Sequence, residues 1–396
     1  MNILLVTGVF THNKREPLGG MGKAVYMIAN GLQERGNEVK ILAPGNGDQR
    51  RRYRGVEVLS YKSDQFLEIV SDFKMLLAII QREINIQKKI KDIGRTWKID
   101  VIHYTGWFGI GLLHIGKIPA VMRISSYTKA QLSSNYTQFR IRVLSFLEQT
   151  AARKMNFIFA PSNVMAQALG KDIKRDIKVI ETPYIPEKVY ENTEILDKKL
   201  KGKKYLLFVG RMSVDKGIFV VRDVLQSVLQ KYSDIYFVFA GVEAEKGITK
   251  EIVMAAGEYK HRVVLLGNLS HELLFPIMRE AEIILIPSLM DNFPNTCAEA
   301  MSLGCIVIGT EGSSLEQFIT DGYDGFLAQR NSADSLGEQI KRALSMDAER
   351  KAEMKIHAMM RVQQLDQKKF FDKLERIYYR VLNMSYKNYI MKNFSK

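Results

Sequence analysis

The clearest structural pattern in the chain lies at residues 287–310, which read PSLMDNFPNTCAEAMSLGCIVIGT and follow the apolar run IILIP at 283–287. The apolar run leads into a polar loop, and residues 296–303 have a composition typical of a helix. A second apolar run, CIVIG at 305–309, follows that helix. Strand, helix and strand in this order predict a βαβ unit with parallel strands.

The same alternation extends outward from this segment along most of the chain. We expect further strands at 3–6, 39–42, 100–103, 120–124, 157–160, 178–180, 205–209, 235–240 and 263–266. Helices are expected at 163–169 and 218–229, and again from 348 to 393. The pattern predicts an α/β protein with two similar parallel-sheet domains.

A polar stretch with two prolines and a lysine-rich end, residues 183–203, separates the two series of strands. Such composition is typical of an interdomain linker. We therefore expect an N-terminal domain at 1–182, a linker at 183–203, a C-terminal domain at 204–365 and a helical tail at 366–396.

Composition excludes several classes of protein. Among 396 residues, 46% are hydrophobic and 26% are charged, which excludes a disordered or collagen-like chain. Two cysteines cannot form the disulfide framework of a secreted protein of this size. No apolar run approaches the ~20 residues of a membrane-spanning helix, and the first ten residues lack the features of a signal peptide. We expect a cytoplasmic protein.

The net charge of +15 is distributed unevenly. Residues 1–182 hold 28 Lys+Arg and 15 Asp+Glu, whereas residues 183–396 hold 30 and 28. An excess of this kind predicts that the first half meets an anionic membrane surface, nucleic acid or phosphorylated substrate. The alternative is an ordinary basic surface that favours solubility.

Residues 72–92 form a basic amphipathic segment. Leucines and isoleucines recur at helical spacing among the basic residues Lys74, Arg82, Lys88, Lys89 and Lys91. A helix of this kind lies on an anionic membrane face, or packs its apolar side on the sheet of its own domain. The sequence leaves both interpretations open.

Glycines and cations follow the expected first strands of both domains. The loop PLGGMG at 17–22 lies between a strand and a helix, where glycines allow a ligand close to the backbone and helix N–H groups favour an anion. In the second domain, Arg211 follows the first strand and Lys216 precedes the next helix. Two cations at the carboxyl edge of a parallel sheet suit a diphosphate.

The segment 287–310 supplies polar groups at the same edge. Asn295 or Thr296 is expected to cap the helix and present backbone amides to a phosphate. Asp291 and Glu299, eight positions apart, are acceptors for sugar hydroxyls. The alternatives are loop chemistry for Asp291 and a favourable charge near the helix N-terminus for Glu299.

These pieces together resemble the retaining glycosyltransferases of family 4, which have the GT-B fold. The matching segments are FVGRMSVDKG, LLGNLSHELLFPIM, AEIILIPSLMDNFPNTCAEAMSLGCIVI and DGYDGFL, in the family's order, with weaker matches at LGGMGKAVYMIANGLQERGNEV, DVIH and FIFAPSNVM. The resemblance implies two Rossmann-like domains that face each other across a cleft, the first on the acceptor side and the second binding the nucleotide sugar. It also implies C-terminal helices that return to the N-terminal domain.

Roles for the donor-side residues follow from the resemblance. Arg211 and Lys216 would bind the donor pyrophosphate and stabilise the charge that develops on the leaving nucleotide diphosphate. Glu299 would bind the ribose hydroxyls, and Asp291 would contact the donor sugar. The remaining donor-binding positions are the backbone amides at Asn295 and Thr296 and the N-domain loop at Gly19 and Gly20.

Several positions depart from the family pattern. Asp291 stands where a glutamate is usual, and Pro294 replaces a common glycine and so removes one backbone donor. The strand that often delivers a histidine to the reacting sugar here reads RISSY at 123–127. Arg123 and Ser125 become candidates for an anionic acceptor or a donor oxygen. His103 is another acceptor-side candidate, although a structural role at the end of a buried strand is the alternative.

The resemblance implies retention of anomeric configuration, by front-face attack in which the leaving phosphate accepts the acceptor's proton. No D-x-D triplet occurs, so we expect no metal and no cofactor. The expected partners are a nucleotide-sugar donor, with UDP favoured over GDP, and a glycan or lipid-linked acceptor in bacterial-type surface polysaccharide synthesis. Peripheral contact of the basic N-domain with an anionic membrane is also expected, and nucleic acid is not.

Two other classes share these features. A nucleotide-sugar epimerase or phosphorylase has the same fold, and fold does not fix function. A nucleotide-sugar-binding protein with degraded catalysis is the third interpretation, which Asp291 and the missing histidine keep open.

Overall fold

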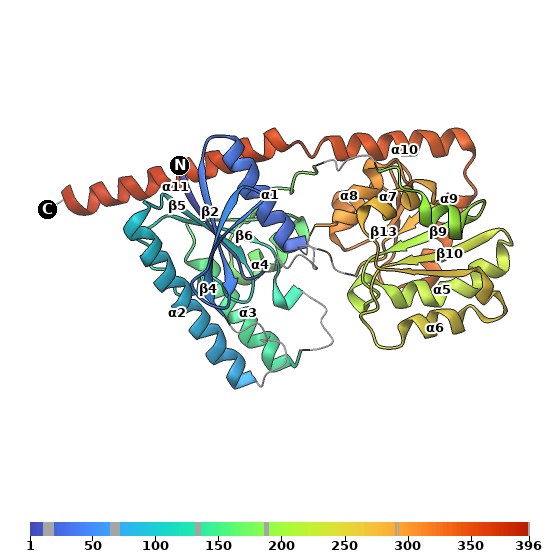
Figure 1. Ribbon diagram of the computed structural model, residues 1–396, viewed down its shortest axis with the longest axis horizontal. Coiled ribbons are helices and arrows are strands. Elements are labelled where there is room, and N and C mark those ends of the chain that lie inside the picture. The colour runs from blue at the N-terminus through green and yellow to red at the C-terminus, as the bar shows by residue number, and fades with distance from the viewer. Residues whose placement is uncertain are drawn as a thin grey trace. The chain divides into compact units, whose positions relative to one another are not determined.

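The chain divides into two compact units, each described by itself. The computed structural model describes residues 1–10, 20–63, 72–130, 136–185, 190–289, 291 and 293–394 (Figure 1). One unit consists of Met1–Thr182 and Lys368–Lys396, and the other of Pro183–Gln367. Each contains one mainly parallel sheet covered by helices on both faces, which confirms the predicted two-domain α/β fold.

The first unit has an eight-stranded sheet in the order β3-β4-β2-β1-β5-β6-β7-β8. All pairs are parallel except β3 with β4. The central strands are almost fully buried, because helices cover both faces of a parallel sheet. The strands are β1 (Asn2–Val6), β2 (Glu38–Gly45), β3 (Arg50–Tyr53), β4 (Val56–Lys62), β5 (Val101–Gly106), β6 (Ala120–Ile124), β7 (Phe157–Ala160) and β8 (Lys178–Val179).

In the described part of this unit, five α-helices cover the sheet. Ile3 and Leu5 of β1 share a core with α1 and α11, whereas Met75 and Ile79 of α2 share another with α3. The helices are α1 (Gly20–Glu34), α2 (Asp72–Thr96), α3 (Gln138–Arg153), α4 (Asn163–Ile173) and α11 (Gln367–Phe394), with the short turn η1 (Thr128–Ala130).

The C-terminal helix α11 returns to the first unit, as predicted (Figure 1). Arg35 at the end of the first helix pairs with Asp372 and Glu375 of α11. The Tyr378 hydroxyl lies 2.6 Å from Nδ1 of His103 in β5. The preceding helix α10 (Ala348–Gln363) stays with the second unit, because its apolar side belongs to that unit's core.

The second unit has a six-stranded sheet in the order β11-β10-β9-β12-β13-β14, parallel throughout. Alternate residues of β9 point to opposite faces, so that Leu207 packs with α7 and α8 while Phe208 packs with α5. The strands are β9 (Lys204–Val209), β10 (Ile235–Ala240), β11 (Val263–Gly267), β12 (Ile283–Leu285), β13 (Val307–Thr310) and β14 (Phe326–Ala328). The α-helices are α5 (Ile218–Lys231), α6 (Ile248–Ala255), α7 (His271–Glu280), α8 (Asn295–Ser302), α9 (Ala333–Leu344) and α10.

Residues 183–203, expected as a linker, belong to the second unit where the structure describes them. A short helical turn, η2 (Leu196–Leu200), buries Leu200 in the core beside β9, and Tyr190, Ile195 and Leu196 pack on the same cluster. The apolar residues among the lysines account for this difference from the expectation. Within the described residues, no helix is both long and apolar enough to cross a membrane.

Candidate functional site

Two loops meet at the carboxyl edge of the second unit's sheet. One runs from β9 through the turn η3 (Val214–Lys216) to α5, and the other follows β12. The Leu289 amide donates to the Asp215 carbonyl oxygen over 2.9 Å, which joins the loops. Gly217 has φ +70°, and a Cβ there would lie 1.9 Å from the carbonyl oxygen of Pro287. Only glycine allows the loops to approach this closely.

The loops bring Lys216 and Asp291 together, although the two residues lie 75 positions apart in the sequence. Lys216 Nζ lies 2.6 Å from Asp291 Oδ2, and the two side chains are 26% and 17% exposed. A cation and a carboxylate therefore share one half-buried position at the sheet edge, where both remain accessible to a ligand.

Arg211 lies in the same β9–α5 loop. Its Nη2 atom is 3.1 Å from Asp215 Oδ2, and Asp215 also accepts a hydrogen bond from the Ser213 hydroxyl. The guanidinium is largely exposed, so this ion pair contributes little to stability and is easily exchanged for another anion.

Helix α8 begins at Asn295, with Thr296 as its second residue. Neither caps it, in contrast to the expectation. Pro294 occupies the cap position, where its side chain has no polar atom to accept a hydrogen bond, and the Asn295 amide donates to the Phe293 carbonyl over 2.9 Å. No side-chain cap therefore covers the first-turn amides of α8 in the described structure, and this end of the helix dipole favours an anion.

Glu299 lies one turn further along α8, where its side chain is 13% exposed. His271, the first residue of α7, places Nε2 4.0 Å from Glu299 Oε1, and its ring stacks on Phe275 with 5.0 Å between centroids. Sequence reasoning missed His271. The only signal for it was its position at the start of the helix that follows β11.

In the first unit, the structure describes only the end of the predicted glycine loop. Gly20 is the first residue of α1, and Gly19 lies outside the described residues. His103 is fully buried in β5, with Nδ1 bonded to the Tyr378 hydroxyl, and burial lowers its pKa to about 3. A neutral, fully buried imidazole held by α11 favours the structural alternative for His103.

Arg123 and Ser125 lie next to each other at the end of β6. Arg123 donates to the Ser125 hydroxyl over 3.0 Å and to the Thr182 hydroxyl over 2.7 Å. Burial lowers the pKa of the guanidinium to about 10. No carboxylate of the described residues pairs with it, so the charge is held by neutral oxygens.

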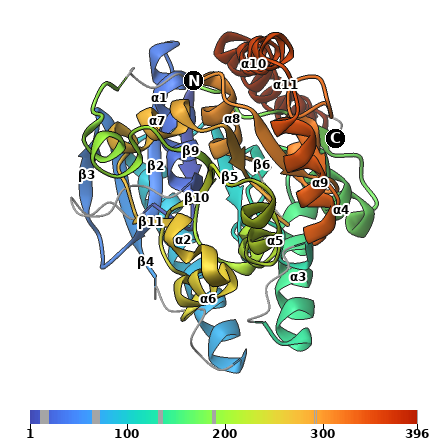
Figure 2. The same cartoon turned by 90° about the vertical axis from the view of Figure 1, so that its right-hand side faces the viewer.

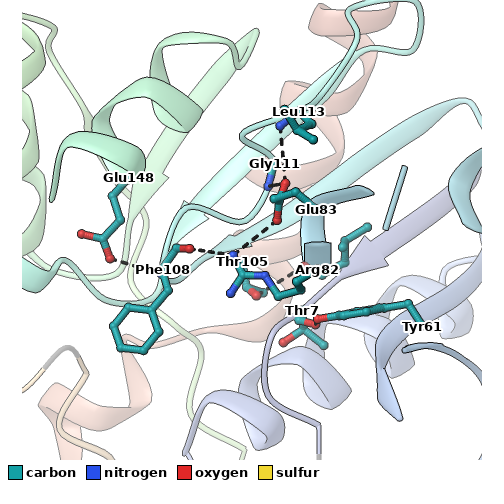
Figure 3. A network of polar contacts seen from close by, with 10 residues as sticks. Thr7, Tyr61, Arg82, Glu83, Thr105, Phe108, Gly111, Leu113 and Glu148 are labelled. Atoms are coloured by element: carbon teal, nitrogen blue, oxygen red, sulfur yellow. Dashed lines mark hydrogen bonds and ion pairs between the residues drawn. The ribbon is translucent and has the colours of Figure 1, made fainter. Parts of the chain in front are cut away.

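A buried charged network lies beneath the carboxyl edge of the first unit's sheet (Figure 3). Arg82 of α2 donates to the Phe108 carbonyl over 2.6 Å and lies 3.3 Å from Glu83 Oε1. Glu83 accepts hydrogen bonds from the amides of Gly111 and Leu113. Arg82 is buried, because its guanidinium contacts carbonyl and carboxylate groups inside the unit.

Glu148 of α3 completes this network. It accepts hydrogen bonds from the Phe108 amide and from the amide and hydroxyl of Thr128, at 2.9–3.2 Å. Burial raises its pKa to about 7. Together the two helices hold the loops that follow β5 and β6, which form the carboxyl edge of this sheet.

The described residues contain no group of three or more histidine, cysteine, aspartate or glutamate side chains that is arranged to hold a metal ion. The candidate site of the second unit comprises two cations, two carboxylates, a helix N-terminus and one histidine. This is a set of groups suited to a phosphate and to polyhydroxyl ligands.

Known proteins match both units. The family model for glycosyl transferases group 1 matches residues 191–359, and that for glycosyltransferase family 4 matches residues 18–188. An uncharacterized glycosyltransferase of Methanocaldococcus jannaschii is 23% identical over 352 residues, which cover 83% of this chain and 86% of that protein. One component of the human phosphatidylinositol N-acetylglucosaminyltransferase is 23% identical over 361 residues, covering 87% of this chain and 68% of that protein.

A solved structure has the same fold. Anabaena HepE in complex with UDP and glucose superimposes with a TM-score of 0.72 at 17% identity, over 96% of this chain and 100% of that one. The two family models adjoin and cover most of the chain. The chain belongs to the family 4, group 1 glycosyltransferases of the GT-B fold.

Proposed function

We propose that the chain is a retaining, metal-independent hexosyltransferase that moves a sugar from a nucleotide-diphosphate sugar to a glycan or lipid-linked acceptor in surface polysaccharide synthesis. The observation that carries the proposal is the Lys216–Asp291 pair, which sits with an uncapped helix N-terminus at one sheet edge of a family 4 glycosyltransferase.

Each donor-side residue has a role in this proposal. Lys216 and Arg211 exchange their present carboxylate partners for the donor diphosphate and stabilise its developing charge. The Thr296 amide holds a phosphate oxygen at the start of α8, and the Asn295 amide joins it on leaving the Phe293 carbonyl. Glu299 accepts hydrogen bonds from the ribose hydroxyls, and Asp291, released from Lys216, accepts one from the donor sugar.

The transfer step is a front-face substitution. The acceptor oxygen forms a bond to the anomeric carbon as the bond from that carbon to the diphosphate oxygen breaks, and the leaving phosphate takes the acceptor's proton. No side-chain base is required. The burial of His103 and the serine at position 125 support this route, because neither group is a base available to an acceptor.

Relatives support the choice of substrates. UDP is favoured as the nucleotide, with GDP as the alternative, since the Anabaena neighbour was solved with UDP and glucose. The human relative's name specifies N-acetylglucosaminyl transfer to phosphatidylinositol, which supports a lipid-linked acceptor. We place the protein in the cytoplasm, in peripheral contact with an anionic membrane through its basic first half.

Thermal-shift titration with UDP, GDP and their sugars tests the donor, because a ligand that binds only the folded state raises the melting temperature. We expect UDP and a UDP-sugar to stabilise the protein and Arg211→Ala to abolish the shift. Arg330→Ala, at an exposed arginine of the same unit, is the matched control. Stabilisation by no nucleotide would refute the proposal.

A second measurement tests the metal-free chemistry. With a responding donor, EDTA leaves the transfer rate unchanged. A strict requirement for Mn²⁺ would contradict this part of the proposal, and donor turnover without any acceptor dependence would favour an epimerase or phosphorylase.

A further inference from the structure

Arg123 carries a buried positive charge that pairs with no carboxylate of the described residues. The residue belongs to β6 and is 4% exposed. Its guanidinium donates to two neutral oxygens, the hydroxyls of Ser125 and Thr182, and its Nε atom is buried without a partner in the described structure. Burial of a charge is costly, and hydrogen bonds to neutral groups return only part of that cost. The first unit therefore keeps a cation that its own described residues do not neutralise.

A second buried arginine of this chain has an evident structural role. Arg262, which directly precedes β11, is 6% exposed and donates over 2.5–3.2 Å to three backbone carbonyl oxygens, those of Leu229, Tyr232 and Ile235. The first two lie at the end of α5, where carbonyl groups lack partners within the helix. Both described acceptors of Arg123 are side-chain hydroxyls, so it supplies no such backbone need.

Other polar groups lie at the same carboxyl edge as Arg123. Strand β7 pairs with β6 and leads into α4, and β6 and α4 lie close together in both views (Figure 1 and Figure 2). Ser162, between β7 and α4, is 1% exposed, and its hydroxyl neither caps the helix nor bonds to another described group. Thr182 follows β8, the next strand of the sheet, and accepts from Arg123. Three neighbouring strands thus place a guanidinium and two hydroxyls at one edge.

These three residues are covered by loops. Each lies within three residues of the carboxyl end of its strand. Loops tolerate rearrangement better than the sheet does. A ligand therefore reaches this edge by displacing loop segments, without opening the sheet.

The electrostatics of this edge call for an anion. Burial lowers the pKa of Arg123, and no carboxylate of the described residues offsets this effect. Burial, with the charge of Arg123 as a second cause, also lowers the pKa of His103 in the neighbouring strand β5. An anion bound at Arg123 would supply the missing countercharge.

A phosphate group suits these donors. A guanidinium is a planar fork that binds two oxygens of one anion, and such charged hydrogen bonds are stronger than those to neutral hydroxyls. Ser162 and Thr182 each have a hydroxyl proton to donate to a further oxygen. A phosphate has such additional oxygens, whereas a carboxylate has only two.

We propose that Arg123, Ser162 and Thr182 bind a phosphate group of the acceptor, so that the transferase selects a phosphorylated acceptor. The acceptor as the source of the phosphate rests on the proposed function, with the first unit on the acceptor side. The phosphate site itself is independent of that function, because all three residues belong to the first unit.

Calorimetric titration of the full chain with inorganic phosphate, at ionic strength matched with chloride, tests the site. Arg123→Met weakens phosphate binding by about tenfold or more, because the anion loses its charged partner. Ser162→Ala/Thr182→Val weakens it severalfold. Lys216→Met removes phosphate binding on the donor side and keeps the binding that depends on Arg123. Arg142→Met, at an exposed arginine of α3, is the control for loss of a positive charge.

Thermal unfolding without phosphate separates this role from a structural one. Arg123→Met leaves the melting temperature unchanged or raises it, because an apolar side chain replaces an uncompensated buried charge. Arg262→Met lowers the melting temperature, because three carbonyl oxygens lose their donor. Added phosphate raises the melting temperature of the parent protein more than that of Arg123→Met.

Two organic phosphates identify the kind of acceptor. Farnesyl phosphate in detergent represents a lipid-linked acceptor, and glucose 6-phosphate represents a water-soluble one. The compound that displaces inorganic phosphate at the lower concentration identifies the class. Arg123→Met binds that compound about tenfold more weakly or less, and its affinity for UDP matches that of the parent protein.

The proposal fails if the parent protein binds no phosphate beyond what Lys216→Met loses, or if Arg123→Met binds phosphate as the parent does. It also fails if Arg123→Met loses as much thermal stability as Arg262→Met, which would identify Arg123 as a structural link between β6 and the segment after β8. Failure of the proposed function gives a different result, in which no nucleotide binds although phosphate binding through Arg123 persists.

Discussion

The Lys216–Asp291 ion pair offers a sharp test of the donor chemistry, because its members respond oppositely to a bound diphosphate. With Nζ and Oδ2 2.6 Å apart, Coulomb's law at an effective dielectric constant of ~20 gives an attraction of about 6 kcal/mol. Desolvation and side-chain ordering offset most of this for half-buried ions, which leaves a net of about 1 kcal/mol. The pair is therefore weak enough for a substrate to separate it.

A bound diphosphate attracts Lys216 and repels the Asp291 carboxylate. We predict that Asp291→Asn tightens UDP binding by about fivefold, equivalent to about 1 kcal/mol, because Lys216 loses its competing partner. Transfer by this variant falls at least tenfold, since the amide is a weaker acceptor for the sugar hydroxyl. Lys216→Met weakens UDP binding and lowers kcat by ~10²–10³, the typical loss when a stabilising donor is removed from a developing anion.

Calorimetric titration with UDP and a transfer assay on the same preparations measure both quantities. Lys250→Met, at an exposed lysine of the second unit, is the control for loss of a positive charge. Weaker UDP binding by Asp291→Asn, to the same degree as by Lys216→Met, would refute the reasoning. It would mean that Asp291 serves to position Lys216 and does not compete with the diphosphate.

Three further predictions concern groups outside this pair. His271→Asn weakens UDP binding severalfold in calorimetry, because the ring lies 4.0 Å from the carboxylate assigned to the ribose, whereas His261→Asn has no effect. Glu148 has a pKa raised to about 7, so between about pH 4.5 and about pH 7 it ionises in the unfolded chain but stays protonated in the folded one. This lowers the unfolding free energy by up to about 3 kcal/mol as pH rises through that range, and urea unfolding should show the fall in the parent but not in Glu148→Gln. Tyr378→Phe leaves a buried histidine nitrogen without its partner and lowers the unfolding free energy by ~1–3 kcal/mol, whereas Tyr379→Phe, at an exposed tyrosine, leaves it unchanged.

Three buried parallel strands could be predicted from sequence with their bounds. Phe157–Ala160 and Ile235–Ala240 are continuous apolar runs, and Ala120–Ile124 is apolar except at Arg123, because both faces of these strands are covered. The edge strand Arg50–Tyr53, which reads RRRY, carries no such signal. It is a strand because it pairs antiparallel with Val56–Lys62, an interaction that local sequence does not encode.

The sequence predicted which residues lie at the candidate site better than it predicted their contacts. The sequence placed Lys216 and Asp291 at one sheet edge, since both follow parallel strands, but the ion pair depends on how closely two loops approach at Gly217. Arg82 and Glu83 could not be recognised as buried, because charged residues on an amphipathic helix are normally solvated. Only the loop that they hold gives the reason for their burial.

The partners of individual cations say more about anion binding than the uneven net charge does. In the second unit, Arg211 and Lys216 have carboxylate partners, Asp215 and Asp291. In the first unit, Arg123 is buried among hydroxyl groups. Arg142 is exposed on α3, and the acidic residue of that helix, Glu148, is buried. Among the described residues, no ion pair with a carboxylate is found for either side chain, so their positive field favours anionic partners. The described cations thus differ between the units: Arg123 is held by hydroxyl groups, whereas Arg211 and Lys216 are held by carboxylates.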